Sequence, residues 1–436
     1  MTALSQRFLS SAAANAVMPF LFLRAGFDAK WRASLGERLG FGDWRDFQAP
    51  SGCLWFHAAS VGEVKGLIPI LANLEEIGIR ERVVLTTTSQ TGKQLASEHN
   101  SDGFNALFPI DHPSCITRVL NKITPKIFVC AETELWPNTL LALKRRKVPV
   151  VIVNGRISDY SYPRYLRFKG YFAPILSGID RVLTQSERDA ERFLALGTSV
   201  EAIRVVGSTK YDNILPRYSA RELYEAFARF GIKPRENCFI AGSVRPGEDE
   251  IVLEAFLAAK KVLSTLQMII APRHPERFDA VAEVLRSRGV SFCRWSEGGK
   301  GERADVLLLD TMGELNRAYA AGSCAFVGAT LVDIGGHNPM EPAGYRVPVI
   351  VGPYHSNITD AVTALESRGA GKIVRDAAEL SEALLHFLGD AERNKRSGSL
   401  AYSVWKQNVG ASKKVVEELS AFLEDKSKTK KAAAAR

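Results

Sequence analysis

Short apolar runs alternate with helical patterns along most of this chain. In the first half, the runs typical of buried strands cover residues 54–57, 83–87, 106–109, 126–130, 148–153, 181–184 and 204–206. The pattern pauses near 213–222 and restarts with runs at 239–241, 267–271, 304–309, 324–327, 347–351 and 372–374. Most connecting segments are long enough for right-handed crossovers, so the pattern predicts parallel sheets covered by helices.

The restart also predicts how the chain divides. A length of 436 residues favours two domains, and 46% hydrophobic content is typical of folded proteins. We therefore expect an α/β protein with two Rossmann-like, doubly wound domains and a ligand-binding cleft between their strand ends. The expected domains are an N-terminal domain over 31–212, a C-terminal domain over 213–398, a closing helical region over 399–423 and a basic, disordered tail over 424–436.

The segment 1–30 is expected to associate with a membrane. It carries no charge between Arg7 and Arg24, but this stretch is shorter than the roughly 20 apolar residues of a spanning helix. Basic residues such as Lys30 follow it where a signal peptide would have its cleavage site, and they suit a cytoplasmic membrane surface. We expect a helix lying in the membrane interface, with an amphipathic core helix as the alternative.

Charge and cysteine content narrow the class of protein. The net charge of +9 and pI near 9.2 indicate anionic partners, namely phosphorylated substrates, acidic lipids or nucleic acid, without choosing among them. The six cysteines are scattered and contain no CxxC pair. They are typical of reduced thiols in a cytosolic compartment, and not of a disulfide framework or a zinc site.

The first candidate site is the segment LWFHAASVGE, in which a strand is followed by a small-residue turn and a helix. This order places Glu63 outside the carboxyl end of a strand, where open α/β sheets bind ligands. The helix N-terminus favours negative charge, so we expect Glu63 to stay ionised and to accept a proton. The alternative is that Glu63 only marks a helix start. His57, inside the strand, is expected to be a hydrogen-bonded core histidine.

Two further carboxylates follow a strand in AETELWPN. Alternation along the strand would direct Glu132 and Glu134 to the same side of the sheet. The alternative is a plain helix start with Pro137 in its first turn. NGRIS then offers Arg156 as an anion ligand, and GSTKYD offers Lys210, which would face a phosphate or carboxylate unless it is simply solvated.

In the second half, two segments predict phosphate binding. GSVRPGEDE combines a Gly/Ser turn with an acidic helix start, a geometry that presents backbone N–H groups to a phosphate. APRHPERF places Arg273, His274 and Arg277 together after a strand, and arginine favours bidentate phosphate contacts.

Two more segments of the second half follow predicted strands and lead into helices. DTMGEL is another strand-to-helix turn, with Gly313 and Glu314 at the helix start. GGHNPMEPA carries Asn338 and Glu341 into a helix, where a glutamate accepts hydrogen bonds from ribose hydroxyls and the helix N-terminus takes the phosphate. The sequence contains no GxxxxGK[ST], HExxH or GxSxG motif and no cluster with metal-ligand spacing.

Taken in order, HAASVGE, AETELWPN, NGRIS, GSTKYD, APRHPERF, DTMGEL and GGHNPMEPA resemble the 3-deoxy-D-manno-octulosonic acid (Kdo) transferases of lipid A biosynthesis. The resemblance covers residues 31–407. It implies a GT-B glycosyltransferase that moves Kdo from CMP-Kdo to lipid IVA and releases CMP. It also implies a place on the cytoplasmic side of the inner membrane, in contact with anionic lipids. No cofactor, metal ion or nucleic-acid partner is expected.

The resemblance also implies roles for single residues. Glu63 corresponds to the proton acceptor, and Glu132 and Lys210 correspond to residues that stabilise the transition state. The positions that correspond to CMP-binding residues are Pro272, Arg273, Met312, Gly313, Glu314, Asn338, Pro339, Met340 and Glu341. The chain departs from the family pattern at Val244 and Arg245, where a Thr-His pair is usual.

Two other functions fit parts of the pattern. One is a GT-B enzyme that uses a nucleotide diphosphate sugar and therefore needs a second phosphate site. The other is a non-catalytic sugar- or lipid-binding protein at the membrane. A binding protein has no use for a base opposite a nucleotide site, so the combination of motifs favours the transferase.

Overall fold

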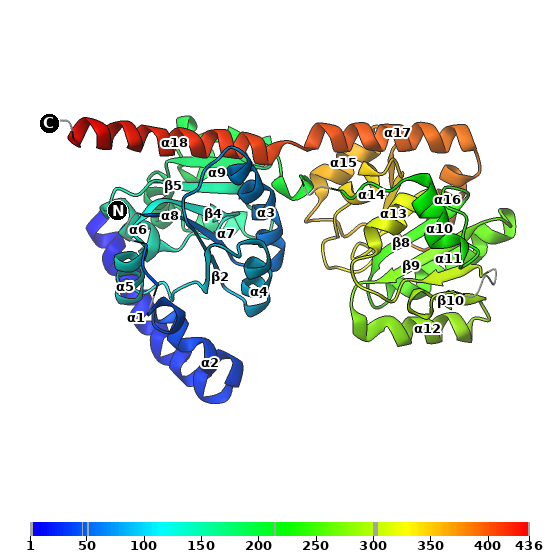
Figure 1. The fold of residues 1–436 in the computed structure, drawn as a ribbon, viewed down its shortest axis with the longest axis horizontal. Coiled ribbons are helices and arrows are strands. Elements are labelled where there is room, and N and C mark those ends of the chain that lie inside the picture. The colour runs from blue at the N-terminus through cyan, green and yellow to red at the C-terminus, as the bar shows by residue number, and fades with distance from the viewer. Residues whose placement is uncertain (1–2, 46, 50–51, 213–214, 300–303, 435–436) are drawn as a thin grey trace. The chain divides into compact units, whose positions relative to one another are not determined.

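The computed structural model describes residues 3–45, 47–49, 52–212, 215–299 and 304–434. The chain forms two compact units, one made of Met1–Asn213 with Val409–Arg436 and the other of Ile214–Asn408. In the described residues, each unit holds one seven-stranded parallel sheet covered by helices (Figure 1). The predicted α/β architecture with two doubly wound sheets is therefore confirmed.

The sheet of the first unit reverses its strand order near its centre. Its strands are β1 (Cys53–Ala58), β2 (Val83–Thr87), β3 (Phe104–Leu107), β4 (Pro125–Ala131), β5 (Val150–Gly155), β6 (Arg181–Thr184) and β7 (Ile203–Val205). Their order is β3-β2-β1-β4-β5-β6-β7, so the chain winds away from β1 in one direction and from β4 in the other. The loops after β1 and β4 therefore leave the sheet at the switch point where doubly wound sheets bind ligands.

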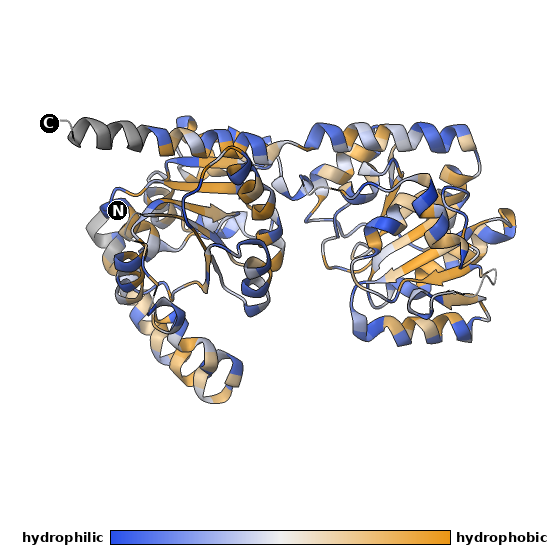
Figure 2. Ribbon diagram, viewed as in Figure 1, coloured by the Kyte–Doolittle hydropathy of each residue, from blue (hydrophilic) through white to orange (hydrophobic). Residues whose placement is uncertain are grey.

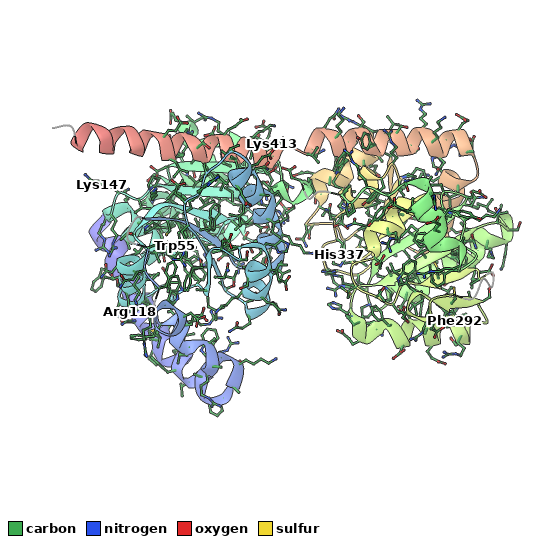
Figure 3. The ribbon with its side chains drawn as sticks, in the orientation of Figure 1. Trp55, Arg118, Lys147, Phe292, His337 and Lys413 are labelled. Carbon is green, nitrogen blue, oxygen red and sulfur yellow. The ribbon has the colours of Figure 1, made fainter. Side chains whose placement is uncertain are left out.

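Helices cover both faces of this sheet. They are α1 (Ala3–Phe27), α2 (Ala29–Arg38), α3 (Val61–Glu76), α4 (Gln90–His99), α5 (Pro113–Ile123), α6 (Pro137–Arg145), α7 (Tyr162–Arg167), α8 (Lys169–Leu176), α9 (Glu187–Leu196) and α18 (Ala411–Ala434), with the short turns η1 (Gly42–Trp44), η2 (Val200–Ala202) and η3 (Thr209–Tyr211). Alternate residues of β1 enter two apolar cores: Trp55 packs on one face and Phe56 on the other. Burial on both faces explains the continuous apolar runs of these strands, which are largely orange in Figure 2. Figure 3 shows Trp55 inside the first unit.

The second unit repeats this plan. Its strands are β8 (Cys238–Val244), β9 (Gln267–Pro272), β10 (Phe292–Arg294), β11 (Val306–Leu308), β12 (Cys324–Val327), β13 (Val349–Val351) and β14 (Gly371–Ile373), in the order β10-β11-β9-β8-β12-β13-β14. The helices are α10 (Ala220–Ala228), α11 (Glu248–Val262), α12 (Phe278–Ser287), α13 (Leu315–Ala321), α14 (Met340–Gly344), α15 (Thr359–Ser367), α16 (Ala377–Leu388) and α17 (Ala391–Asn408), with turns η4 (Pro275–Arg277) and η5 (Trp295–Glu297). Its switch point lies between β8 and β12.

Each predicted strand overlaps an observed one, and the differences lie at edges. The edge strand β10 was not predicted because its three residues are only partly buried and form no apolar run. β3 begins two residues before the predicted 106–109 run, which included Pro109. A proline has no N–H for the ladder, so the strand ends before it.

The end of the chain returns to the first unit. Helix α18 packs on α3 through apolar residues such as Val415 and Leu419, and the Asp212 carboxylate accepts bonds from the N–H groups of Gly410 (2.6 Å) and Ser412 (2.5 Å) at its start. The helix continues through 424–434, so the prediction of a disordered tail is wrong there. Lysine and alanine, which fill this segment, are strong helix formers. Residues 435–436 of the predicted tail lie outside the described residues.

The predicted membrane-associating segment forms helix α1. In the described part of the chain, its stretch Phe8–Phe27 is the one that is long and apolar enough to cross a membrane, with a mean hydropathy of 1.3 and only 11% of it buried. Phe20 is 71% exposed and Phe27 is 92% exposed. A core helix would bury such side chains, so this exposure argues against the core-helix alternative.

Candidate active site

Glu63 lies at the switch point of the first sheet, in the first turn of α3. The helix begins there because the Ser60 hydroxyl caps it and accepts a bond from the Glu63 N–H (3.3 Å). The carboxylate turns back onto the same loop. One oxygen accepts from the Ala59 N–H (2.8 Å) and the other from the Ser60 hydroxyl (2.9 Å). Glu63 is therefore both a helix-start residue and a fixed carboxylate, only 7% exposed.

The surroundings of Glu63 change its acidity. Burial raises its pKa to about 7, and the negative charges of Glu132 and Glu134 add to this effect, whereas the bonds from Ala59 and Ser60 oppose it. The expectation that Glu63 stays ionised at the helix N-terminus is therefore wrong, because burial disfavours the charged form and leaves the carboxyl only partly ionised near neutral pH. A carboxyl group with a pKa near neutrality is well matched to the role of a general base.

This raised pKa makes the stability of the first unit depend on pH. Folding favours the neutral form of Glu63, so its stabilising contribution is full below the usual pKa of 4.5 and is lost as the pH rises through about 7. We expect Glu63→Gln to raise the free energy of unfolding at pH 8 by on the order of 3 kcal/mol. The difference should vanish below pH 4.5. Urea unfolding at both pH values measures it, and equal stability at pH 8 would contradict the burial argument.

Glu132 and Lys210, each expected to stabilise the transition state, form an ion pair. The backbone of Glu132 leaves β4 in the left-handed region (φ 57°), and its N–H donates to the carbonyl of Val153 on β5 (2.8 Å). Its carboxylate then lies 2.5 Å from the Lys210 ammonium. A non-glycine residue with this φ is strained, and such strain occurs often at functional sites.

Three buried residues that the sequence analysis missed hold Lys210 in place. The Thr209 N–H donates to the Asn154 side-chain oxygen (2.9 Å), and the Asn154 amide donates to the Thr209 hydroxyl (2.7 Å). The same hydroxyl donates to the carbonyl of Gly66 on α3 (2.5 Å). A Cβ on Gly66 would lie 2.8 Å from the Asn154 amide nitrogen, so glycine permits this close approach. The NGRIS and GSTKYD segments therefore meet on the helix that carries Glu63.

His57 ties the Glu132 loop to β1. The Trp136 indole donates to His57 Nε2 (3.2 Å), and His57 Nδ1 lies 3.0 Å from the Thr86 carbonyl. Complete burial lowers the His57 pKa to about 3, so the imidazole is neutral. Its Nε2 can therefore accept the hydrogen bond from the Trp136 indole N–H. The expected hydrogen-bonded core histidine is confirmed.

Helix α6 begins at Pro137, as the helix-start alternative predicted, and Glu134 lies in the loop just before it. The Asp111 carboxylate caps this helix by accepting the N–H groups of Asn138 (2.9 Å) and Thr139 (2.8 Å). Glu134 is partly buried, and burial raises its pKa, as does the charge of Glu132. The predicted pair of carboxylates therefore lies in one acidic cluster with Glu63.

In the second unit, the three predicted nucleotide-binding segments share one edge of the sheet. Pro272 ends β9 and Arg273 follows it, 312–314 follow β11, and 338–341 follow β12 and enter α14. All these strands are parallel, so their carboxyl ends meet at the same edge.

Aromatic and charged contacts link two of these segments. Glu314 pairs with Arg317 (2.6 Å), whose guanidinium lies 5.6 Å from the ring centre of Tyr218. The Tyr218 ring in turn lies 6.3 Å from that of Tyr345, at the end of α14. Helix α13, which follows the 312–314 turn, therefore lies beside α14.

The candidate nucleotide-binding residues differ in how far their side chains are exposed to solvent. Met312 is 59% exposed, and Gly313 adopts a left-handed φ of 92° beside open space. Asn338 caps α14 by accepting the Met340 N–H (3.0 Å). Met340 is only 1% exposed, so its side chain packs in the core and is not offered to a ligand.

Comparison with known proteins now decides the family. A sequence profile described as 3-Deoxy-D-manno-octulosonic-acid transferase (kdotransferase) matches residues 33–213. The chain is 33% identical to the 3-deoxy-D-manno-octulosonic acid transferase of Haemophilus influenzae over 411 residues, covering 94% of this chain and 96% of the relative. It is 32% identical to the transferase of the same description from Bordetella pertussis, covering 92% and 94%. The chain belongs to the Kdo transferase family.

The fold of this chain is also similar to that of a protein with a solved structure. UDP-GlcNAc 2-epimerase from Neisseria meningitidis, bound to UDP-GlcNAc, superposes with a TM-score of 0.60 at 16% identity, covering 84% of this chain and 99% of the epimerase. The predicted GT-B architecture of two Rossmann-like domains is confirmed by this likeness and by the two sheets. The chain is thus a glycosyltransferase by family and GT-B by fold.

Carboxylates of the chain already occupy groups in two segments that were predicted to contact a phosphate. Glu248, fully buried, accepts the N–H groups of Ala329 (2.8 Å), Thr330 (2.9 Å) and Leu331 (2.9 Å). It also accepts the N–H of Arg245 (2.9 Å), so a carboxylate of the chain uses the N–H group that GSVRPGEDE was expected to offer. In the same way, Arg277 is held 2.5 Å from the buried Asp249 carboxylate and acts as a structural cation.

The Glu248 contacts predict a large effect on stability. We expect Glu248→Ala to cost the second unit about 3–5 kcal/mol, because it leaves four backbone donors, two of them on the fully buried residues Ala329 and Thr330, without their acceptor. The exposed Glu250 in the same helical turn provides the control, and Glu250→Ala should change stability by less than about 0.5 kcal/mol. Urea unfolding followed by circular dichroism measures both, and a similar small cost for the two variants would contradict the role of Glu248.

Among the described residues, no group of three or more His, Cys, Asp or Glu side chains is placed to hold a metal ion. The six cysteines are free thiols, and five of them are buried.

Proposed function

We propose that this protein is an inverting glycosyltransferase that moves Kdo from CMP-Kdo to lipid IVA and releases CMP. Membership of the Kdo transferase family supports the donor and the lipid acceptor. The observation that carries the mechanism is the buried Glu63 carboxyl, with a pKa of about 7, beside the Glu132–Lys210 ion pair.

In the proposed reaction, Glu63 takes the proton from the primary hydroxyl of the distal glucosamine of lipid IVA. The resulting oxygen nucleophile attacks the anomeric carbon of Kdo, and the bond to the CMP phosphate breaks as the new glycosidic bond forms. The transition state resembles an oxocarbenium ion, and negative charge builds up on the departing CMP. A cation such as Lys210, oriented by Glu132, stabilises charge that develops in this step.

We assign donor binding to the second unit. Arg273 would contact the phosphate, while Glu341 would accept hydrogen bonds from the ribose at the N-terminus of α14. The remaining proposed CMP-binding positions are Pro272, Met312, Gly313, Glu314, Asn338, Pro339 and Met340, with Met340 acting through the packing of α14. The leaving group is a monophosphate without a diphosphate to clamp, so the proposal needs neither a resident metal nor a cofactor.

We further propose that α1 attaches the protein to the cytoplasmic side of the inner membrane. The exposed apolar side chains of Phe8–Phe27 would enter the lipid, and the lipid acceptor would reach the enzyme there. Anionic headgroups suit the net charge of +9.

Mass spectrometry of the product tests the proposed activity. Purified protein incubated with CMP-Kdo and lipid IVA should give lipid IVA heavier by one or more Kdo residues, together with released CMP. In the same time, the Glu63→Gln variant should convert at least about a hundredfold less lipid IVA. If the protein instead consumed a UDP-linked sugar and left CMP-Kdo intact, the rival GT-B function would replace this proposal.

A further inference from the structure

Helices α7 and α8 present an exposed surface that combines apolar and basic side chains. We call the following set the α7–α8 surface: Tyr160, Arg164, Leu166, Arg167, Phe168 and Lys169. Its large apolar members are Tyr160, 79% exposed, Leu166, 40% exposed, and Phe168, 58% exposed. Single exposed apolar residues are common on proteins, but three within nine positions beside cations form a patch.

The charge of this surface has one sign. The segment 160–178 contains three cations and no acidic residue. The nearest acid before it, Asp159, is bound by Arg188 (2.6 Å) and Arg192, so it does not neutralise the patch. Arg164 lies over the Tyr160 ring at 4.5 Å, which keeps the aromatic ring and the cation together.

The fold does not need these exposed side chains. The opposite side of the same helices carries Tyr165, Tyr171 and Phe172, which pack against the first unit's apolar core. The two helices are therefore anchored by one set of aromatic residues and present a second set to solvent.

Helix α8, through the side opposite to the α7–α8 surface, contacts helix α1. The buried Gln6 side chain of α1 donates to the Tyr171 carbonyl (2.8 Å), and the Ser10 hydroxyl bonds the Tyr171 hydroxyl (2.8 Å). Between them on α1 lie Phe8, 75% exposed, and Leu9, 48% exposed. The exposed apolar side chains of α1 therefore begin next to helix α8. This helix starts at Lys169, directly after Phe168.

We propose that the α7–α8 surface is a second membrane contact, which binds the anionic headgroups and outer acyl region of a phospholipid bilayer. This proposal rests on the membrane attachment proposed for α1. Aromatic and aliphatic side chains would sit at the headgroup boundary, while Arg164, Arg167 and Lys169 bind lipid phosphates. The absence of acidic residues favours a lipid surface over a typical protein partner, whose rim mixes both signs of charge.

A fluorescent label at position 168 tests the contact directly. In a Cys293→Ser background, which removes the one partly exposed thiol, Phe168→Cys is labelled with an environment-sensitive NBD group. Vesicles of equal parts phosphatidylethanolamine and phosphatidylglycerol should shift its emission to the blue and increase it. The matched control is Val262→Cys, 74% exposed on the second unit, which should not respond. An unchanged spectrum at 168, on vesicles that demonstrably bind the protein, would overturn the proposal.

Replacing the three cations of the α7–α8 surface tests whether it binds anionic headgroups. The triple variant Arg164→Ala, Arg167→Ala, Lys169→Ala should weaken partitioning onto these vesicles by roughly a hundredfold, since each basic residue near an anionic surface contributes about a fivefold gain. The control variant Lys261→Ala, Arg286→Ala, Arg288→Ala removes the same charge from the second unit and should bind as the natural chain does. Equal binding by both triple variants would contradict a specific contact.

Activity in detergent separates this proposal from the proposed function. With detergent-dispersed lipid IVA, the first triple variant should transfer Kdo at the natural rate, because no bilayer is needed. If it is inactive there while the natural chain is active, the surface serves the reaction or the fold and the membrane proposal fails. If the natural chain itself transfers no Kdo, the proposed function fails, and the label at 168 still reports whether the surface meets lipid.

Discussion

Glu63→Gln is expected to lower kcat for Kdo transfer by about 10²–10⁴-fold while binding of CMP-Kdo stays unchanged. Glutamine keeps the shape of the side chain and still accepts the bond from the Ala59 N–H, but it cannot take a proton. The loss should therefore appear in the chemical step and not in KM for the donor. Initial rates with saturating substrates, together with calorimetric titration of CMP-Kdo, measure both quantities.

The same helix supplies the control for this experiment. Glu76 is exposed at the far end of α3, so Glu76→Gln changes the same charge at a distance from the site. Its turnover should equal that of the natural chain. Turnover of Glu63→Gln within a few-fold of the natural value would remove Glu63 from the proton-transfer role.

Lys210→Met should lower kcat by about 10²–10³-fold, the usual loss when one preorganised charge is removed from the reacting centre. The ammonium lies 2.5 Å from Glu132, and the hydrogen bonds between Asn154 and Thr209 hold the turn η3 that carries Lys210. Methionine has nearly the same length and no charge, so the packing around η3 should be kept. The exposed Lys65 on α3 is the matched control, and Lys65→Met should leave kcat unchanged.

A double variant shows whether the ion pair works as a unit. If Glu132 acts by orienting Lys210, Glu132→Gln combined with Lys210→Met should lose little more than Lys210→Met alone. Fully additive losses would indicate that the two residues act independently, and would contradict the pairing seen in the structure.

The strand pattern and the main motifs were predictable from sequence because each depends on neighbours along the chain. A buried strand followed by a small-residue turn and a capped helix places Glu63 outside the carboxyl end of a strand in any parallel sheet, whereas its position at the switch point follows from the observed strand order. For the same reason, Glu132 and Arg273 were correctly placed directly after strands, and Glu341 was correctly placed at the start of a helix. The resemblance to the Kdo transferase family added the roles that position alone does not give.

The features that were missed depend on residues far apart in the sequence. Burial by the rest of the unit, and not the local helix, sets the pKa of Glu63. The Glu248 carboxylate binds the backbone after β12, about eighty positions away in the sequence. The segment GSVRPGEDE taken alone therefore resembles a phosphate-binding loop. For Asn154, the residue type itself is a sequence signal of an unusual backbone conformation, because asparagine tolerates the left-handed φ of 53° found there.

The pH dependence of kcat/KM tests the central claim most directly, because it follows ionisation of the proposed base in the free enzyme. The natural chain should gain activity as the pH rises through about 7, where Glu63 ionises. Glu132→Gln removes a negative charge that raises this pKa, so the rising limb should move to lower pH. The residual activity of Glu63→Gln should lack that limb. If the same rising limb near pH 7 persisted in Glu63→Gln, a different group would be the base and the account would be wrong.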